Sequence, residues 1–225
     1  MHEQADTLDD LLGARFSCRA FLQNDIADAT LREIVTSAGK APSWCNAQPW
    51  SVILTKGAAT RKLRALLRAA HASNHDPAPD FDWPVGYSGA YLDRRRAVGW
   101  QLYHAVGVQK GDREGAARQS ARNFVMFDAP HVAIVHCPAE LGSYGAIDCG
   151  GFITTFCLAA QARGLATIPQ AAPTAYCPQI RDHFNLPADR RIVCAIALGQ
   201  PDLTHAANSF RAPRAPLEEI CDIVD

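Results

Sequence analysis

Apolar residues repeat with helical spacing in several segments of the chain and form short continuous runs in others. Leu8, Leu11 and Leu12 begin the pattern, in a helix that ends at Gly13. The periodic segments predict helices over residues 8–12, 28–38, 63–70, 94–106, 113–127 and 146–163. The continuous runs predict strands over residues 50–55, 131–137, 165–169 and 191–199. In this interpretation Asp28 is the N-cap of the second helix.

The predicted strands and helices do not alternate regularly along the chain. Regular alternation would favour a doubly wound parallel sheet, so its absence favours an α+β fold. The chain has 225 residues, enough to bury one large core, and we expect residues 1–225 to form a single domain. Apolar residues make up 48% of the chain and charged residues 20%, as is typical of an ordered globular protein.

Charge and hydropathy exclude some classes of partner. The formal net charge is -1, so the chain has no general attraction for nucleic acid or for an anionic membrane. It contains no apolar stretch long enough to cross a bilayer. Residues 1–10 are acidic and lack the basic start and apolar run of a signal peptide, so we expect a cytoplasmic protein.

The cysteines and histidines give little support for disulfides or for a metal site. The 8 cysteines are scattered without a C-x-x-C pair, and we expect them to be reduced thiols. His71 and His75 would share one helical face, but no third ligand accompanies them, so a surface pair is expected and no metal. Cys45 has no histidine near it in the sequence, which favours a packing thiol over a nucleophile.

A basic turn follows the first helix. Arg15, Ser17 and Arg19 place two guanidinium groups and a hydroxyl within one short turn, which suits the binding of a single phosphate group. A solvated turn is the ordinary alternative, because exposed arginines are common. Arg211 and Arg214 lie near the other end of the chain, and they matter to such a site only if folding brings the two clusters together.

The loop before the first predicted strand combines amide groups, a hydroxyl and aromatic rings. The residues concerned are Pro42, Ser43, Trp44, Asn46, Gln48, Pro49 and Trp50. Such a set suits a planar heterocycle with polar edges. A tight loop capped by Asn46, with Trp50 packed under the sheet, would use the same residues.

Taken together, these stretches resemble the FMN-dependent nitroreductase family. RFSCRAF, residues 15–21, resembles the family signature for the FMN phosphate and ribityl chain, and APSWCNAQPW, residues 41–50, resembles the loop that follows it. GLATIPQAA, residues 164–172, resembles the segment along the isoalloxazine edge, and NSFRAPRAPLEE, residues 208–219, resembles the basic C-terminal segment. The order and separation of these stretches also match.

The resemblance implies a nitroreductase-like α+β fold, with a central, mainly antiparallel β-sheet surrounded by helices, in an intertwined homodimer. One subunit would hold the FMN phosphate and ribityl chain, the loop of the other subunit would reach the flavin, and residues around Gln170 would line the redox edge near N5. The implied cofactor-binding residues are Arg15, Phe16, Ser17, Arg19, Pro42, Ser43, Trp44, Asn46, Pro169, Gln170, Ala171, Arg211 and Arg214.

The implied activity is NADH- or NADPH-dependent reduction of a nitroaromatic or quinone-type small molecule by a ping-pong mechanism. Because the cofactor carries the chemistry, no catalytic side chain is required. The alternatives are a non-catalytic flavin-binding module, or another reaction on the same scaffold such as reductive dehalogenation. Residues 80–103 are a candidate substrate cover, with ordinary surface or dimer packing as the alternative.

Two departures from the family pattern leave substrate and nicotinamide preference open. Trp44 stands where many members have a second serine, and Gln170 and Ala171 stand where some have an acidic side chain. Asp148 is expected in the first turn of the long helix, where the helix dipole accounts for an acidic residue, so we assign it no role in the site.

Overall fold

The computed structural model describes residues 2–73 and 75–224, and its centre is a four-stranded antiparallel sheet. The strands are β1 (Ser51–Thr55), β2 (His131–Pro138), β3 (Ala166–Gln170) and β4 (Arg190–Gly199), in the order β1-β2-β4-β3. Every neighbouring pair is antiparallel, which confirms the predicted sheet. The central strands β2 and β4 are almost entirely buried, which explains why they read as continuous apolar runs.

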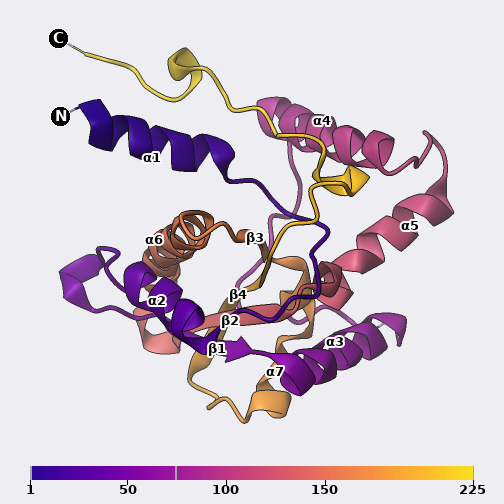
Figure 1. Cartoon of the computed structure of the whole chain (residues 1–225). Coiled ribbons are helices and arrows are strands. Elements are labelled where there is room, and N and C mark those ends of the chain that lie inside the picture. Colours follow the sequence, from indigo (N-terminus) through magenta and orange to yellow (C-terminus); the bar gives the residue numbers. More distant parts are fainter. Residues whose placement is uncertain (1, 74, 225) are drawn as a thin grey trace.

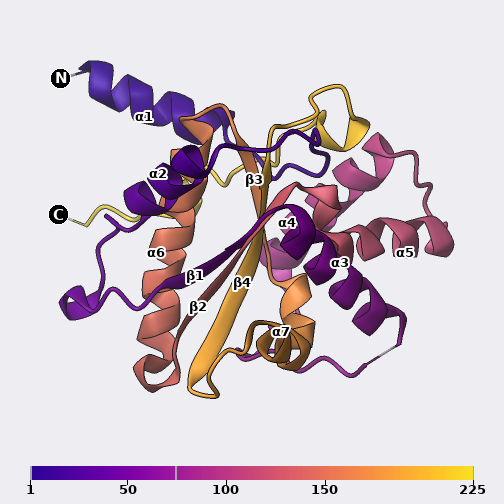
Figure 2. The ribbon, with the colours of Figure 1, turned by 60° about the horizontal axis from the view of Figure 1, so that its bottom comes forward.

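Helices cover both faces of the sheet (Figure 2). On one face lie α2 (Asp28–Ala38) and α6 (Gly142–Gln161), which bury Ile34, Phe152 and Phe156. On the other lie α3 (Gly57–Ala72) and α7 (Cys177–Phe184). Leu63 and Leu67 of α3 are buried in the hydrophobic core on this face. The sheet therefore separates two hydrophobic cores.

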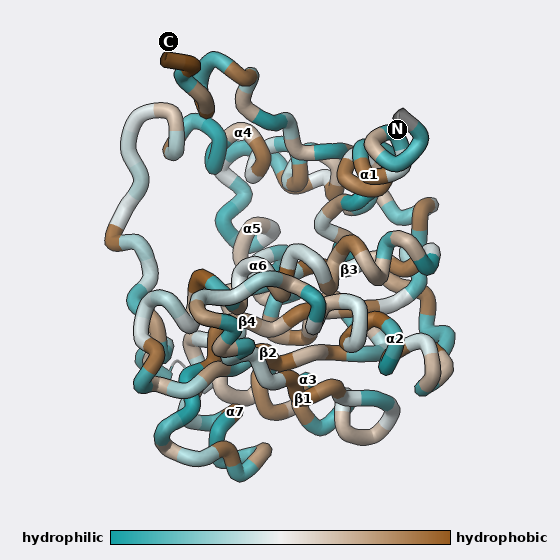
Figure 3. The backbone as a smooth tube through the Cα atoms, turned by 90° about the vertical axis from the view of Figure 1, so that its left-hand side faces the viewer, coloured by the Kyte–Doolittle hydropathy of each residue, from teal (hydrophilic) through white to brown (hydrophobic). Residues whose placement is uncertain are grey.

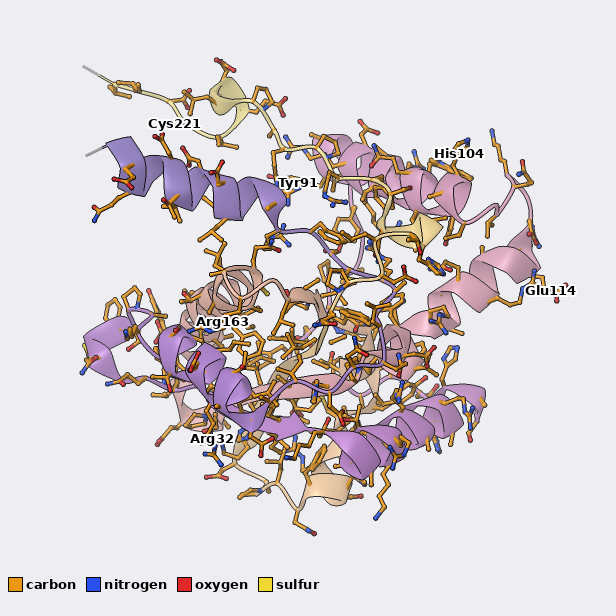
Figure 4. All side chains as sticks on the ribbon, in the orientation of Figure 1. Arg32, Tyr91, His104, Glu114, Arg163 and Cys221 are labelled. Atoms are coloured by element: carbon orange, nitrogen blue, oxygen red, sulfur yellow. The ribbon has the colours of Figure 1, made fainter. Side chains whose placement is uncertain are left out.

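Three helices and the C-terminal tail lie outside the two helical layers that cover the sheet (Figures 1 and 3). They are α1 (His2–Ala14), α4 (Gly89–Ala105) and α5 (Arg113–Ala121), and α4 has no fully buried residue. The tail beyond β4 forms two short 3-10 helices, η5 (Ala206–Asn208) and η6 (Leu217–Glu219). Figure 4 shows Cys221 of the tail and Glu114 of α5 at the periphery of the molecule. These elements leave large apolar side chains in solvent, among them Leu12, Trp100 and Ile220.

Several predicted boundaries were wrong for identifiable reasons. Asp28 is the first residue of α2 rather than its N-cap, and its carboxylate pairs with the Lys56 ammonium at 2.6 Å. α4 begins at Gly89, ahead of the predicted start at residue 94. The prediction missed this start because the helix has no apolar stripe to mark it. α6 begins at Gly142 rather than at residue 146. The prediction missed its first turn because the glycines there do not form a helical pattern in the sequence.

The helix predicted over residues 113–127 is two elements. α5 ends at Ala121, and the chain continues as a 3-10 helix, η2 (Arg122–Asp128). Met126, Phe127 and Asp128 have φ values of 53°, 51° and 56°, the left-handed region that non-glycine residues rarely occupy. Such backbone costs on the order of 1–3 kcal/mol per residue, so the surrounding packing must hold it in place.

The two histidines do not form the predicted surface pair. α3 ends at Ala72, so His75 lies beyond the helix. His71 is half-buried: its ring stacks on Phe124 at a centroid distance of 4.0 Å, and its Nδ1 lies 3.3 Å from the Tyr176 hydroxyl.

All 8 cysteines are free thiols. Residues 2–73 and 75–224 hold no cluster of three or more potential metal ligands from His, Cys, Asp and Glu, and none of their helices is long and apolar enough to span a membrane.

The long loop between α3 and α4 is anchored by one buried carboxylate, Asp80. The Arg181 guanidinium donates to both Asp80 oxygens at 2.7 Å, and the Ile192 amide of β4 donates to Asp80 Oδ2 at 2.7 Å. Removing one partner would leave a buried charge without its counterpart, so this pair holds the loop against the sheet.

A neutral histidine on β2 makes the stability of the fold depend on pH. His136 is 8% exposed, and the Arg190 Nε–H donates to its Nδ1 at 3.0 Å. Burial, followed by the charges of Arg190 and Arg181, lowers the pKa of His136 from 6.5 to about 4. The folded protein therefore resists protonation that the unfolded chain accepts.

We expect the free energy of unfolding to fall as pH drops from 6.5 to about 4, by up to roughly 3 kcal/mol from His136 alone. The His136→Gln variant keeps an acceptor for Arg190 and should lose this part of the pH dependence. Urea denaturation at several pH values measures both slopes. Equal slopes for the variant and the wild type would show that His136 does not titrate as described.

Candidate functional site

The two arginine clusters meet around one cavity of about 270 Å³. The segment that leaves α1 supplies Arg15, Phe16, Ser17 and Arg19, and the tail supplies Phe210, Arg211 and Arg214. Leu12, Gly13, Val98 and Ala212 complete the lining. The fold thus brings together residues that are almost 200 positions apart in the chain.

Hydrogen bonds to the sheet hold the N-terminal segment in place. Ser17 forms a parallel bridge with Thr167 of β3, and the Cys18 amide donates to the Thr167 carbonyl at 3.1 Å. Further along, Phe21 forms an antiparallel bridge with Pro201, just after β4. The basic turn is therefore a continuation of the sheet edge rather than a free surface loop.

One buried amide side chain, Asn208, ties the tail to this segment. Its Oδ1 accepts from the Arg19 amide at 2.8 Å, and its Nδ2 donates to the carbonyls of Ala20 at 2.9 Å and Asp202 at 2.8 Å. Asn208 is 3% exposed. These three bonds set the position of Arg211, three residues further along the tail, relative to Arg19.

The cavity is strongly positive. Among the described residues, no carboxylate lies within 4.0 Å of the guanidinium groups of Arg15, Arg19, Arg211 or Arg214. Burial lowers the pKa of Arg19, and burial raises the pKa of the neighbouring Cys18 thiol to about 11, so that thiol stays neutral. The part of the chain that the structure describes therefore supplies no counter-charge for these arginines.

The arginines are oriented by backbone carbonyls and by an aromatic ring. Arg19 donates to the Ser17 carbonyl at 3.1 Å, and Arg211 donates to the carbonyls of Asn208 and Phe210 at 2.9 Å each. The Arg211 guanidinium also lies 3.8 Å from the centroid of the Phe16 ring. Each arginine keeps further N–H donors, which an anion such as a phosphate monoester would satisfy.

A second cavity, of about 620 Å³, shares Leu12, Gly13, Arg15 and Arg214 with the first. Its other walls are Ile153, Thr154 and Cys157 of α6 and Pro169 of β3. These walls are apolar or small, so a phosphate held by the arginines could carry a flat ring system along α6 towards β3.

The structure places the predicted redox-edge residues unequally. Pro169, which lines the second cavity, and Ala171 are exposed, whereas Gln170 is 4% exposed. The Gln170 Nε2 donates to the Asn123 Oδ1 at 3.0 Å and lies 3.3 Å from the Asn123 carbonyl. The Gln170 side chain thus points into the protein, and only its backbone is left for a ligand at this edge.

A third cavity adjoins the first through Arg19, and no pattern in the sequence indicated it. It has a volume of about 560 Å³ and is lined by Arg19, Arg122, Gln119, His205 and small or apolar residues of α4 and η5. Arg122 stood within a helix predicted from apolar spacing, so nothing marked it as part of a site.

The predicted loop residues Pro42, Ser43, Trp44 and Asn46 line none of these three cavities within one chain. The loop is nevertheless held by hydrogen bonds of its own. It contains the 3-10 helix η1 (Trp44–Asn46), and the Ser43 hydroxyl accepts from the Gln48 amide at 3.0 Å. The Trp44 side chain is 62% exposed and lies against Tyr144, so the loop presents an indole ring to its surroundings.

Asp148 holds this loop, which corrects the expectation for that residue. Because α6 begins at Gly142, Asp148 lies beyond the first turn and the helix dipole does not account for it. Its carboxylate accepts from the Trp44 amide, at 3.1 Å to Oδ1 and 3.2 Å to Oδ2. Trp50, at the other end of the loop, stacks on Phe152 of α6 at 5.4 Å, as the packing interpretation expected.

Comparison with known proteins identifies the family. The family model described as "Nitroreductase family" matches residues 12–200. The chain belongs to the nitroreductase family. A relative from Pseudomonas putida, a 4-nitrobenzoate reductase, is 35% identical over 211 residues, which are 93% of this chain and 92% of that protein. A chloronitrobenzene nitroreductase from Comamonas testosteroni is 32% identical and covers 96% of each chain.

Solved structures of nitroreductases support the same assignment. The FMN-dependent nitroreductase NfnB from Mycobacterium smegmatis, solved in complex with NADPH, superposes with a TM-score of 0.94 at 31% sequence identity. The match covers 99% of this chain and 100% of that one. The α+β nitroreductase-like fold predicted from the motifs is therefore confirmed.

The contribution of Asn208 can be tested through cofactor affinity. Asn208→Ala removes the two hydrogen bonds that join the two arginine clusters and a third within the tail, so we expect FMN to bind at least tenfold more weakly. Asn24→Ala is the matched control, because Asn24 donates only to the exposed Gln200 side chain. Flavin fluorescence titration measures both affinities, and equal FMN affinities in the two variants would rule out this role for Asn208.

Proposed function

We propose that this nitroreductase is an FMN-dependent oxidoreductase that uses NADH or NADPH to reduce nitroaromatic or quinone-type small molecules. The observation that carries the proposal is the four-arginine cavity, which no carboxylate of residues 2–73 and 75–224 lines and which opens onto apolar walls of α6 and β3. A dianionic phosphate attached to a flat ring fits both the charge and the shape of these joined cavities.

The residues present fit FMN group by group. Arg15, Ser17, Arg211 and Arg214 would hold the phosphate and the start of the ribityl chain, while Arg19 would lie nearer to the ring. Bound FMN would supply the redox chemistry, accepting a hydride from the nicotinamide and passing two electrons to the acceptor. The positive charge of Arg19 would favour the negative charge that reduction adds to the ring.

The protein itself would bind and orient rather than act as an acid, base or nucleophile. Burial raises the pKa of Cys157, the thiol that lines the second cavity, so it stays protonated and unreactive. The Gln170 side chain is a neutral amide, which is neither an acid nor a base at neutral pH, and it points inwards to Asn123. Pro169 and the backbone around Gln170 would instead limit access to one edge of the ring.

We further propose that residues 1–225 form one domain that works as a homodimer, with Pro42, Ser43, Trp44 and Asn46 completing the site of the partner. The support is threefold. The loop is hydrogen-bonded to Asp148 but lies outside the arginine cavity of its own chain, its indole ring is exposed, and α1, α4 and the tail leave apolar side chains uncovered. A dimer would bury these surfaces.

The absorption spectrum of the purified protein tests the proposed function. We expect a yellow protein whose visible flavin absorbance is lost on adding NADH or NADPH and returns with a nitroaromatic or a quinone. A colourless protein that gains no thermal stability from FMN would contradict cofactor binding. Bound FMN that neither nicotinamide reduces would contradict turnover and support a non-catalytic flavin-binding module.

The assignment of the phosphate site can be tested on one arginine. Arg15→Ala should weaken FMN binding by about 1.5–3 kcal/mol, because it removes a charged contact from the cavity. Arg113→Ala, at the exposed start of α5, is the control and should leave the affinity unchanged. Similar losses in both variants, measured by fluorescence titration, would place the FMN phosphate elsewhere.

A further inference from the structure

Another basic cavity, separate from the three cavities described above, lies between α3 and η2. It has a volume of about 580 Å³ and is lined by Gln23, Arg61, Arg64, Ala65, Arg68, Val125 and Asp128. We call these residues the basic groove. The groove shares no lining residue with the two joined cavities of the FMN site. Its volume is within the range of small-ligand sites.

The spacing along α3 explains how three arginines reach one groove. Arg61, Arg64 and Arg68 are separated by three and then four positions, so they lie on one face of the helix. The opposite face is buried through Leu63 and Leu67, which fixes the rotation of α3 against the sheet. The small Ala65 leaves room between the arginine side chains.

The charges in the groove do not balance. Asp128 is its one carboxylate among the described residues, and it is shared: Arg64 Nη1 donates to Oδ1 at 3.3 Å, and Arg122 Nη1 donates to Oδ2 at 2.7 Å. Arg61 and Arg68 have no carboxylate within 4.0 Å among the described residues. The three guanidinium groups of the groove thus face one carboxylate, and that carboxylate already accepts a hydrogen bond from a fourth guanidinium group, that of Arg122.

The wall opposite the arginines is held in an unfavourable backbone conformation. Met126, Phe127 and Asp128 are successive left-handed residues, and Gln23 Nε2 donates to the Asp128 carbonyl at 2.8 Å. Met126 and Phe127 are buried in the core, so the packing that holds them also places the Asp128 carboxylate at the groove. Strained backbone of this kind clusters at binding sites.

We propose that the basic groove binds a phosphate-bearing small molecule at a site separate from the FMN phosphate cavity. Arg61 and Arg68 would provide the contacts, and Arg64 would turn from Asp128 to the ligand. The phosphate could belong to the adenosine end of NADPH or to a different phosphorylated molecule. The proposal does not depend on the proposed function, because it concerns residues outside the two joined cavities.

The test uses FMN-saturated protein, so that the four-arginine cavity is filled, and inorganic pyrophosphate as the probe in isothermal titration calorimetry. We expect one pyrophosphate per chain, and an affinity about tenfold lower for each arginine removed in Arg61→Gln and Arg68→Gln. Arg113→Gln, on exposed α5, should bind as the wild type does. An unchanged flavin spectrum checks that each variant is folded.

A substitution with the opposite effect makes the test sharper. Asp128→Asn removes the competing carboxylate and should strengthen pyrophosphate binding several-fold. Asparagine tolerates the left-handed region, so the backbone of the wall should survive the change. Weaker binding in this variant would contradict the competition between Asp128 and the ligand.

The proposal is overturned if the FMN-saturated protein does not bind pyrophosphate, or if Arg113→Gln loses as much affinity as Arg61→Gln. The ratio of kcat/KM for NADPH to that for NADH then separates the two sources of the phosphate. A ratio that falls in the Arg61→Gln, Arg68→Gln double variant identifies the coenzyme. A ratio that stays constant while pyrophosphate binding is lost identifies a separate ligand.

Discussion

The mutual repulsion of four guanidinium groups around one small cavity is the constraint on which the candidate site depends. Charges of the same sign repel most where solvent is excluded, and here no carboxylate among the described residues balances them. Backbone carbonyls, the Phe16 ring and the Asn208 amide hold the arginines against that repulsion. A bound phosphate would relieve it, so cofactor binding and the stability of this part of the fold should be linked.

The same constraint explains why the site is built from both ends of the chain. The N-terminal segment pairs with β3, and Asn208 of the tail is hydrogen-bonded to that segment. Neither stretch alone surrounds an anion. Beyond Arg214 the tail extends away from the sheet (Figure 1), and Glu219 of η6 pairs with Arg94 of α4.

The sequence predicted the sheet and the arginine clusters better than it predicted the rest of the site. β2 and β4 are continuous apolar runs with both faces covered, and Leu63 and Leu67 mark α3 by their spacing, so local pattern was sufficient there. The start of α4 was missed because this helix has no buried face, and η2 because its left-handed residues follow from packing rather than from residue type. Asn208 and Arg122 had no local signal, since each acts through contacts with residues distant in the sequence. The inward orientation of Gln170 likewise depends on Asn123, which sequence spacing does not place beside it.

Helix α6 has a mechanical consequence. Near its start Asp148 fixes the exposed loop, and further along Ile153, Thr154 and Cys157 form a wall of the second cavity. At 1.5 Å per residue, the nine-residue step from Asp148 to Cys157 corresponds to about 14 Å along a rigid rod. In a symmetric dimer this helical segment would fix the distance between the loop, which contributes to one cofactor site, and the cavity wall, which contributes to the other. Adding or deleting a single residue between these points would rotate one relative to the other by about 100°, so the length of this helical segment is less free to vary than its composition.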